Sequence, residues 1–96
     1  MQPHIVLKPG AVTSVTVSST TAALTTPDTE TVGAILTIET GDVRMKWDGE
    51  NPSASAGALM KADSVWEVTG RDLLVAMRFY AVTVDALVTC AELKGY

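Results

Sequence analysis

The sequence predicts an all-β protein, built as a single antiparallel β-sandwich or flattened barrel of about seven to nine strands. Three observations lead to this prediction. Apolar and polar residues alternate with a period of two in several segments, which is typical of half-buried strands. Thr and Val, whose branched side chains fit a pleated surface, are abundant. Turn-forming residues recur about every eight to twelve positions, which is the spacing found in sandwiches and barrels.

The composition is that of one folded domain. The chain has 96 residues, of which 47% are hydrophobic and 19% are charged, so it can bury a core. Residues 1–10 are predicted to form an N-terminal arm or an edge strand, because Pro3 and Pro9 cannot donate hydrogen bonds to a sheet. Residues 11–96 are predicted to form the single β-sandwich domain.

The domain is expected to begin with two strands of different length. Residues 11–18 form the first, and an offset in their alternation indicates a bulge near residues 13–14. A shorter strand is predicted over residues 21–25. The polar residues 26–32 are then expected to form a surface connection.

The clearest predicted unit is a β-hairpin made of residues 33–39 and 43–48. The short connection between them contains Gly41, which suits a left-handed backbone conformation. Leu36 and Ile38 are expected to share one face of the first strand. Ile35 would lie on the other face, so that this strand is covered on both sides.

The loop after this hairpin is the stretch around which the chain is predicted to be organised. Asp48 and Gly49 form the pair best suited to a turn that needs positive φ. Pro52 fixes a second bend, and Gly57 ends the loop. We therefore expect Asp48, Gly49, Pro52 and Gly57 to be structural loop residues. Trp47, directly before them, is predicted to pack in the core or between sheets.

The C-terminal part of the chain is predicted to contribute four strands. Residues 58–60 and 64–69 form the first two. Residues 73–83 form the longest β-like run, although Leu, Ala and Met make a helix the alternative over residues 73–80. One face of this run is expected to carry Val75, Met77, Phe79 and Ala81. Residues 87–93 are predicted to form the last strand, paired with the run before it.

Charge and cysteine content argue against several classes of function. The net charge of −4 and the scattered basic residues are unsuited to nucleic acid. Cys90 is the only cysteine, so no internal disulfide is possible, and His4 alone cannot complete a zinc site with it. We expect Cys90 to be a small buried hydrophobic residue. No apolar run suits a membrane span or a signal peptide, so the protein is expected in a cytoplasm or in an assembly formed there.

The sequence contains no recognisable catalytic arrangement. A nucleophilic triad would need His4, which lies in a proline-flanked terminus. Asp48 and Glu50 are more easily interpreted as a turn residue and an exposed side chain than as an acid–base pair. The same loop lacks the ligand pattern of a calcium site, and Pro52 interrupts it. We therefore predict no enzyme and no catalytic, cofactor-binding or metal-binding residues.

Residues 34–57, followed by Leu59, Asp63 and the strand at residues 79–82, resemble a group of small tailed-bacteriophage virion structural proteins. Their specific motif is a D-G-x-x-P-[ST]-A-[ST]-x-G loop, which residues 48–57 match. The resemblance implies a compact β-sandwich without a catalytic residue. A short D-G-x-x-P-[ST] pattern also occurs in sandwich modules attached to bacterial glycosidases.

The resemblance extends over residues 11–93 with two departures. Ser53 stands where the phage proteins often have Thr, which keeps the hydroxyl. Ala62 stands where they usually have glycine, which puts the local turn type in question.

The function implied by this resemblance is structural. The favoured hypothesis is a capsid decoration (cement) protein that binds the head shell, with a head–tail or tail-associated virion component as the alternative. The implied partners are further copies of the chain and major capsid or other virion proteins, without nucleic acid or membrane. The implied location is the virion, assembled in the bacterial host cytoplasm. A second alternative is a carbohydrate-binding β-sandwich module, in which Trp47 or Trp66 stacks on sugar.

Overall fold

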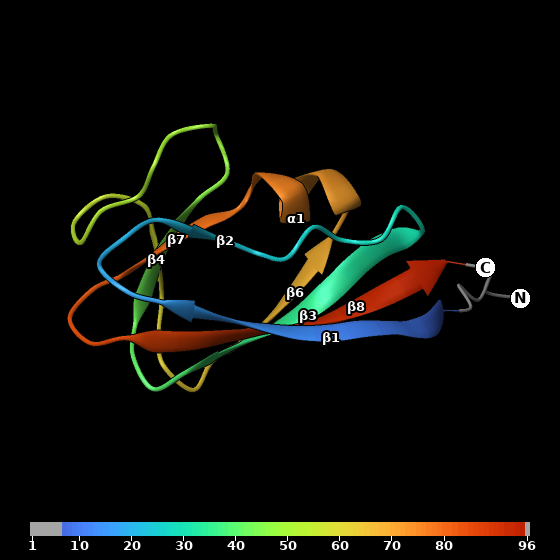
Figure 1. The fold of residues 1–96 in the computed structure, drawn as a ribbon, viewed down its shortest axis with the longest axis horizontal. Helices are drawn as coiled ribbons and strands as arrows, with labels where there is room; N and C mark the ends of the chain where they lie inside the picture. Colours follow the sequence, from blue (N-terminus) through green and yellow to red (C-terminus); the bar gives the residue numbers. More distant parts are fainter. Residues whose placement is uncertain (1–6, 96) are drawn as a thin grey trace, which may run out of the picture.

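The computed structural model describes residues 7–95, which fold into two four-stranded antiparallel sheets packed face to face (Figure 1). The predicted all-β sandwich is therefore confirmed. The first sheet has the strand order β1-β8-β3-β6 and the second has the order β2-β7-β4-β5. The elements are β1 (Leu7–Val17), β2 (Ala22–Ala23), β3 (Thr31–Glu39), β4 (Val43–Lys46), β5 (Ala58–Met60), β6 (Val65–Thr69), α1 (Arg71–Ala76), β7 (Arg78–Ala81) and β8 (Ala86–Gly95). Within these residues no helix is long or apolar enough to cross a bilayer.

The strand pairings are nested about the middle of the chain. β4 pairs with β5, β3 with β6, β2 with β7 and β1 with β8, all antiparallel. Additional pairings of β3 with β8 and of β4 with β7 complete the two sheets. A chain that folds back on itself in this way and then wraps into two sheets is an eight-stranded jelly roll. Among the described connections between consecutive strands, only the β4–β5 loop stays within one sheet.

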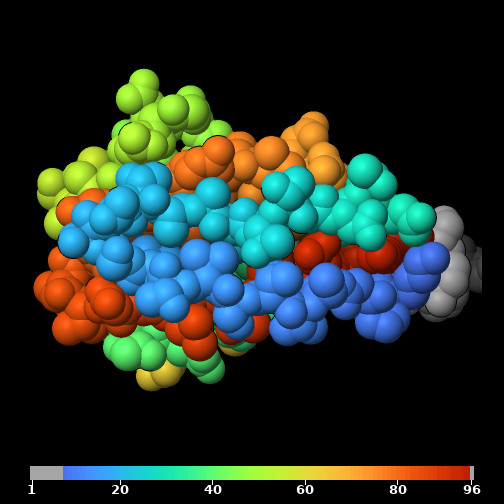
Figure 2. Space-filling model, in the orientation of Figure 1, coloured from blue at the N-terminus to red at the C-terminus, as the bar shows by residue number. Residues whose placement is uncertain are grey.

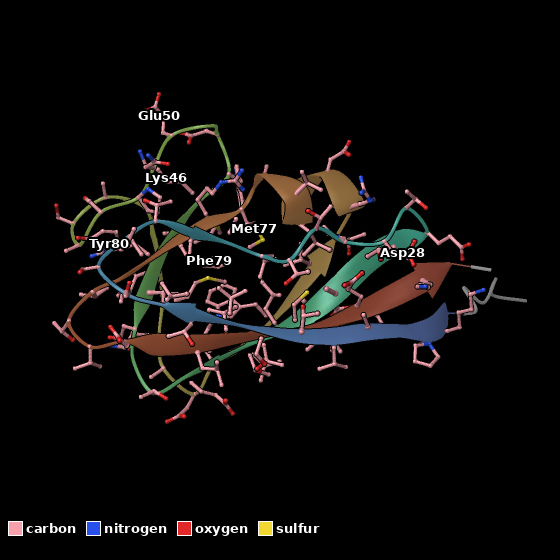
Figure 3. All side chains as sticks on the ribbon, viewed as in Figure 1. Asp28, Lys46, Glu50, Met77, Phe79 and Tyr80 are labelled. Carbon is pink, nitrogen blue, oxygen red and sulfur yellow. The ribbon has the colours of Figure 1, made fainter. Side chains whose placement is uncertain are left out.

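The core lies between the sheets and is built from alternate residues of the strands. On β3 the side chains of Leu36 and Ile38 are fully buried, whereas Ile35 on the opposite face is 39% exposed. The predicted face of Leu36 and Ile38 is therefore confirmed, but only one side of this strand is covered. Phe79 from β7 is the largest fully buried side chain, and Figure 3 shows it with Met77 between the sheets.

The predicted hairpin between residues 33–39 and 43–48 is wrong. Both segments contain strands, but β3 belongs to the first sheet and β4 to the second. The connection carries the chain across the core, so that the buried sides of the two strands face each other. Thr40, not Gly41, takes the positive φ of 79°. Gly41 is needed for space instead, because a Cβ there would lie 2.7 Å from Val84 Cγ2.

The predicted strand over residues 73–83 is only partly correct. Its first part lies in the short helix α1, the alternative that the Leu and Ala content had suggested, and its second part is β7. Leu74 is the buried residue of the helix, whereas Val75 is 42% exposed. Met77, Phe79 and Ala81 are buried, as predicted for their face. The predicted pairing of this run with the last strand is wrong, since β8 pairs with β1 and β3 in the other sheet.

Smaller differences concern the N-terminal half. The bulge of β1 lies between Pro9 and Val12, and not at residues 13–14, because Gly10 passes close to the Glu92 backbone. The short strand expected over residues 21–25 is reduced to the two residues of β2. Of the expected N-terminal arm, residues 1–6 lie outside the described residues, and residues 7–10 form the beginning of β1.

The position of Cys90 leads to a prediction on thiol reactivity. Cys90 is 2% exposed on a central strand, and burial together with the neighbouring Glu92 carboxylate raises the pKa of its thiol to about 11. At pH 8 only about one thiol in a thousand would be ionised, so a thiol reagent should label the native protein very slowly. Labelling should become fast when denaturant is added. Rapid labelling without denaturant would contradict the burial of this face of β8.

Candidate functional site

The loop between β4 and β5, residues 47–57, projects beyond the sheets at one end of the molecule (Figure 1, yellow-green). Asp48 opens it with a short turn, in which its Oδ1 accepts the backbone N–H of Glu50 at 3.0 Å. Gly49 has φ of 87°, so the predicted positive φ at this residue is confirmed. Nothing lies within 4 Å of the position that a Cβ at Gly49 would occupy. The outer end of the loop therefore depends on backbone conformation and not on packing.

The inner end of the loop is packed tightly against β4. Pro52 is buried, and Gly57 has φ of 121°. A Cβ at Gly57 would lie 2.9 Å from the carbonyl oxygen of Met45, so no larger residue fits. Arg44 fixes the same point, because its Nη1 donates to the carbonyl oxygen of Gly57 at 3.1 Å. All four predicted loop residues thus lie in one connection, in which Gly57 lies against β4, Pro52 is buried, and Asp48 and Gly49 form a turn directly after β4.

A shallow cleft of about 210 Å³ lies beside this loop, lined by Met45, Lys46, Trp47, Asp48, Gly57 and Ala58. The Trp47 side chain borders it and is 54% exposed, so its predicted packing in the core is wrong. The alternation that buries Val43 and Met45 would have placed Trp47 inside, but β4 ends at Lys46 and the chain turns outward. Trp66 is 40% exposed on a strand of the other sheet, and its indole N–H donates to Ser64 Oγ at 2.7 Å.

At the other end of the molecule lies a polar cluster that sequence reasoning missed. Glu92 on β8 is only 4% exposed, and its Oε1 accepts the Thr31 hydroxyl at 2.6 Å and the Asp28 backbone N–H at 3.1 Å. These bonds tie the β2–β3 connection to β8. The sequence carried a signal for Glu92, because it follows Val88 and Cys90 on the buried face at a spacing of two.

Asp28 extends this cluster to the surface, and Figure 3 shows it far from Glu50 of the β4–β5 loop. Its Oδ2 lies 2.7 Å from Lys94 Nζ. The hydrogen bond from Lys94 and a second one from the Glu30 N–H hold the pKa of Asp28 below its usual value. The same bond to Asp28 raises the pKa of Lys94. Arg71 donates to the carbonyl oxygens of Pro27 and Asp28, so the charged groups are engaged in closing this end of the sandwich.

The outer face of the first sheet carries exposed apolar and hydroxyl-bearing side chains. Two cross-strand rows cross it. One consists of Val12, Ala91 and Ile35 and ends at Glu67 on β6, and the other consists of Ser14, Thr89, Thr37 and Val65. Val12 and Val65 are 67% and 68% exposed. The two carboxylates on this face, Glu39 and Glu67, lie at the end of β3 and on the edge strand β6, which is the margin of the face. We call this surface, made of these two rows, the neutral face.

Residues 7–95 contain no group of three or more His, Cys, Asp or Glu side chains that could hold a metal ion. Asp48 and Glu50, the acid–base pair considered from the sequence, come together through the Asp48 carboxylate and the Glu50 backbone, which forms a turn. Two surfaces of the described residues are exposed and apolar enough to contact a ligand or a partner through side chains, the cleft beside Trp47 and the neutral face.

Substitution of the two loop glycines, Gly49 and Gly57, should destabilise the protein by different amounts. Gly49→Ala should destabilise the protein by about 1 kcal/mol, the cost of a left-handed conformation with free space around it. Gly57→Ala should cost about 2–3 kcal/mol, because strain is added to the contact with the Met45 backbone. Urea unfolding of both variants measures the difference. Equal stabilities, or a milder effect at Gly57, would contradict the close passage of the loop over β4.

Comparisons of the chain with protein-family models, with curated proteins and with solved structures found no match. A functional interpretation therefore depends on the two surfaces described above and on the sequence resemblance of the loop.

Proposed function

We propose that this protein is a non-enzymatic bacteriophage virion structural protein that decorates the capsid by binding the head shell. The observation that supports the proposal is the neutral face. A sheet face that contacts only water normally carries polar and charged side chains between its apolar ones. Here Val12, Ile35 and Val65 are exposed among Ala and Thr, and the one charged residue in the two rows is Glu67, which lies opposite Ile35 on the edge strand β6. Such a surface is suited to a protein partner with a complementary apolar and hydroxyl-bearing face.

The loop motif and the fold agree with this proposal. Residues 48–57 match the loop of the small phage virion proteins, and in the structure this loop is the point where the chain folds back. Jelly rolls occur in viral capsid proteins and also in lectins. By analogy, the fold therefore agrees both with a virion protein and with a carbohydrate-binding module. The proposed partners are major capsid or other virion proteins and further copies of the chain. A head–tail or tail-associated position would use the same face.

Binding to shells tests this proposal with a matched pair of variants. Ile35 and Leu59 are each 39% exposed, Ile35 on the inner strand β3 of the neutral face and Leu59 on the second sheet. Ile35→Lys should weaken binding to undecorated shells at least tenfold, or about 1.4 kcal/mol, because a charge would be buried against the partner. Leu59→Lys should bind like the unmodified protein. Co-sedimentation measures binding, and melting temperatures check that both variants fold.

The proposal fails if the unmodified protein neither binds shells nor occurs in virions. Equal loss in the two variants would place the contact elsewhere on the surface. Labelling of purified virions with an antibody against the protein separates the head surface from the head–tail junction and the tail.

A carbohydrate-binding module is the second candidate, and the exposed Trp47 beside the cleft favours it. An exposed indole can stack on a sugar ring. In that case soluble oligosaccharides should change the tryptophan fluorescence, and Trp47→Ala should remove the change while Trp66→Ala retains it. If no oligosaccharide from bacterial cell walls changes the tryptophan fluorescence, this candidate is eliminated.

A further inference from the structure

The four sheet edges differ in how far they are protected against pairing with another strand. The edges of the second sheet are short, with two residues in β2 and three in β5. In the first sheet β6 has five residues, includes Glu67 and leads directly into α1. Short edge strands and charged side chains both discourage additional strands. β1, the remaining edge, has eleven residues and neither form of protection along most of its length.

The segment Gly10–Val17 of β1 has the properties of an open strand edge. It contains no charged residue and no proline, and it is rich in Val and Thr. Its register with β8 is regular from Val12 to Val17, since the bulge precedes it. Within residues 7–95, this strand pairs with β8 alone. Figure 2 shows β1, in blue, running uncovered across the front of the molecule.

An antiparallel strand bonded on one side only leaves every second residue with its N–H and C=O directed away from the sheet. Alternate residues of the regular part of β1, Val12–Val17, therefore offer backbone donors and acceptors to solvent along about 20 Å. These groups fit an extended chain, which would extend the first sheet by one strand.

We propose that the β1 edge binds the β1 strand of a second copy of this chain, antiparallel and related by a two-fold axis near Ser14. Such pairing gives a dimer in which the first sheets of both copies join into one eight-stranded sheet. This dimer rests on the proposed function, which includes further copies of the chain among the partners. It is tested with purified protein and without shells. Failure of the dimer would leave the shell-binding experiment unaffected.

The side-chain pattern of β1 favours a second copy as the occupant. Thr13, Val15 and Val17 face the core side, whereas Val12, Ser14 and Thr16 face outward. A two-fold axis at residue 13, 14 or 15 places outward residues opposite outward residues and core-side residues opposite core-side residues. No like charges meet within Gly10–Val17, although each copy carries a net charge of −4.

In the dimer, the β1 edge of each copy would be covered by the β1 strand of the other. A two-fold contact uses the same strand of both copies, so the assembly closes at two and cannot grow into a fibre through this edge. The contact is small, about 20 Å by 10 Å or about 200 Å² per copy, compared with about 800 Å² in a standard interface. Association should therefore depend on concentration, and it is favoured where copies are held close together.

Sedimentation velocity over about 10 µM to 1 mM tests this pairing with two variants from one cross-strand row. Ser14 and Val65 lie at opposite ends of the row Ser14–Thr89–Thr37–Val65 and are both exposed. The sedimentation coefficient of the unmodified protein should rise towards that of a dimer. Ser14→Lys should shift this rise to at least tenfold higher concentration, because two like charges would meet near the axis. Val65→Lys should dimerise like the unmodified protein.

Amide hydrogen exchange of the unmodified protein supplies a measurement that is independent of any variant. Alternate amides of residues 11–17 should become protected as the concentration rises, while amides of β6 stay unchanged. A monomer over the whole range, or a dimer without this alternating protection, would overturn the proposal. So would loss of the dimer in Val65→Lys, which would place the contact on the neutral face instead of the edge.

Discussion

The close passage of Gly57 over the backbone of Met45 is the constraint on which the rest of the structure depends. It lies at the point where the chain turns back, so that β5 to β8 run antiparallel to β4 to β1. The passage requires a residue without a side chain, and the hydrogen bond from Arg44 holds it in place. The other pairings are nested outward from this point, β3 with β6, β2 with β7 and β1 with β8. The ends of the described chain are consequently brought together at the far end of the molecule (Figure 1).

The fold class could be predicted from the sequence because the period of two reports directly which side of a strand is buried. On this basis Leu36 and Ile38 were placed on one face of a strand, and Phe79 on one face of the run over residues 73–83, and all three are fully buried. The same period does not say which strands are neighbours. Residues 33–39 and 43–48 have the pattern of a hairpin, but it is equally that of two strands facing each other across a core. The difference is decided by partners far along the chain, β6 and β8 for β3 and β7 for β4, which no local pattern encodes.

The candidate sites were predictable to different degrees for the same reason. The turn at Gly49 is local, so its positive φ was foreseen from the Asp-Gly pair. The exposure of Trp47 was not, since it depends on β4 ending one residue earlier. Glu92 could have been recognised as a buried carboxylate from its spacing with Cys90. Its partners Thr31 and Asp28 come from a connection about sixty residues away, so the polar cluster itself required the tertiary structure.

The distribution of charge separates the surfaces of this protein into two kinds. Arg44, Lys46, Asp48 and Glu50 gather at the fold-back end, and a paired cluster closes the opposite end. The neutral face between them could carry Lys or Glu at little cost in stability, because Val12 and Val65 are mostly exposed and outward positions of strands tolerate such changes. Burial in the monomer therefore does not account for the apolar residues at these positions. The proposed contact with a partner would account for them by excluding water from the face, and the proposed edge contact at β1 would extend the same surface across two copies without adding a charge.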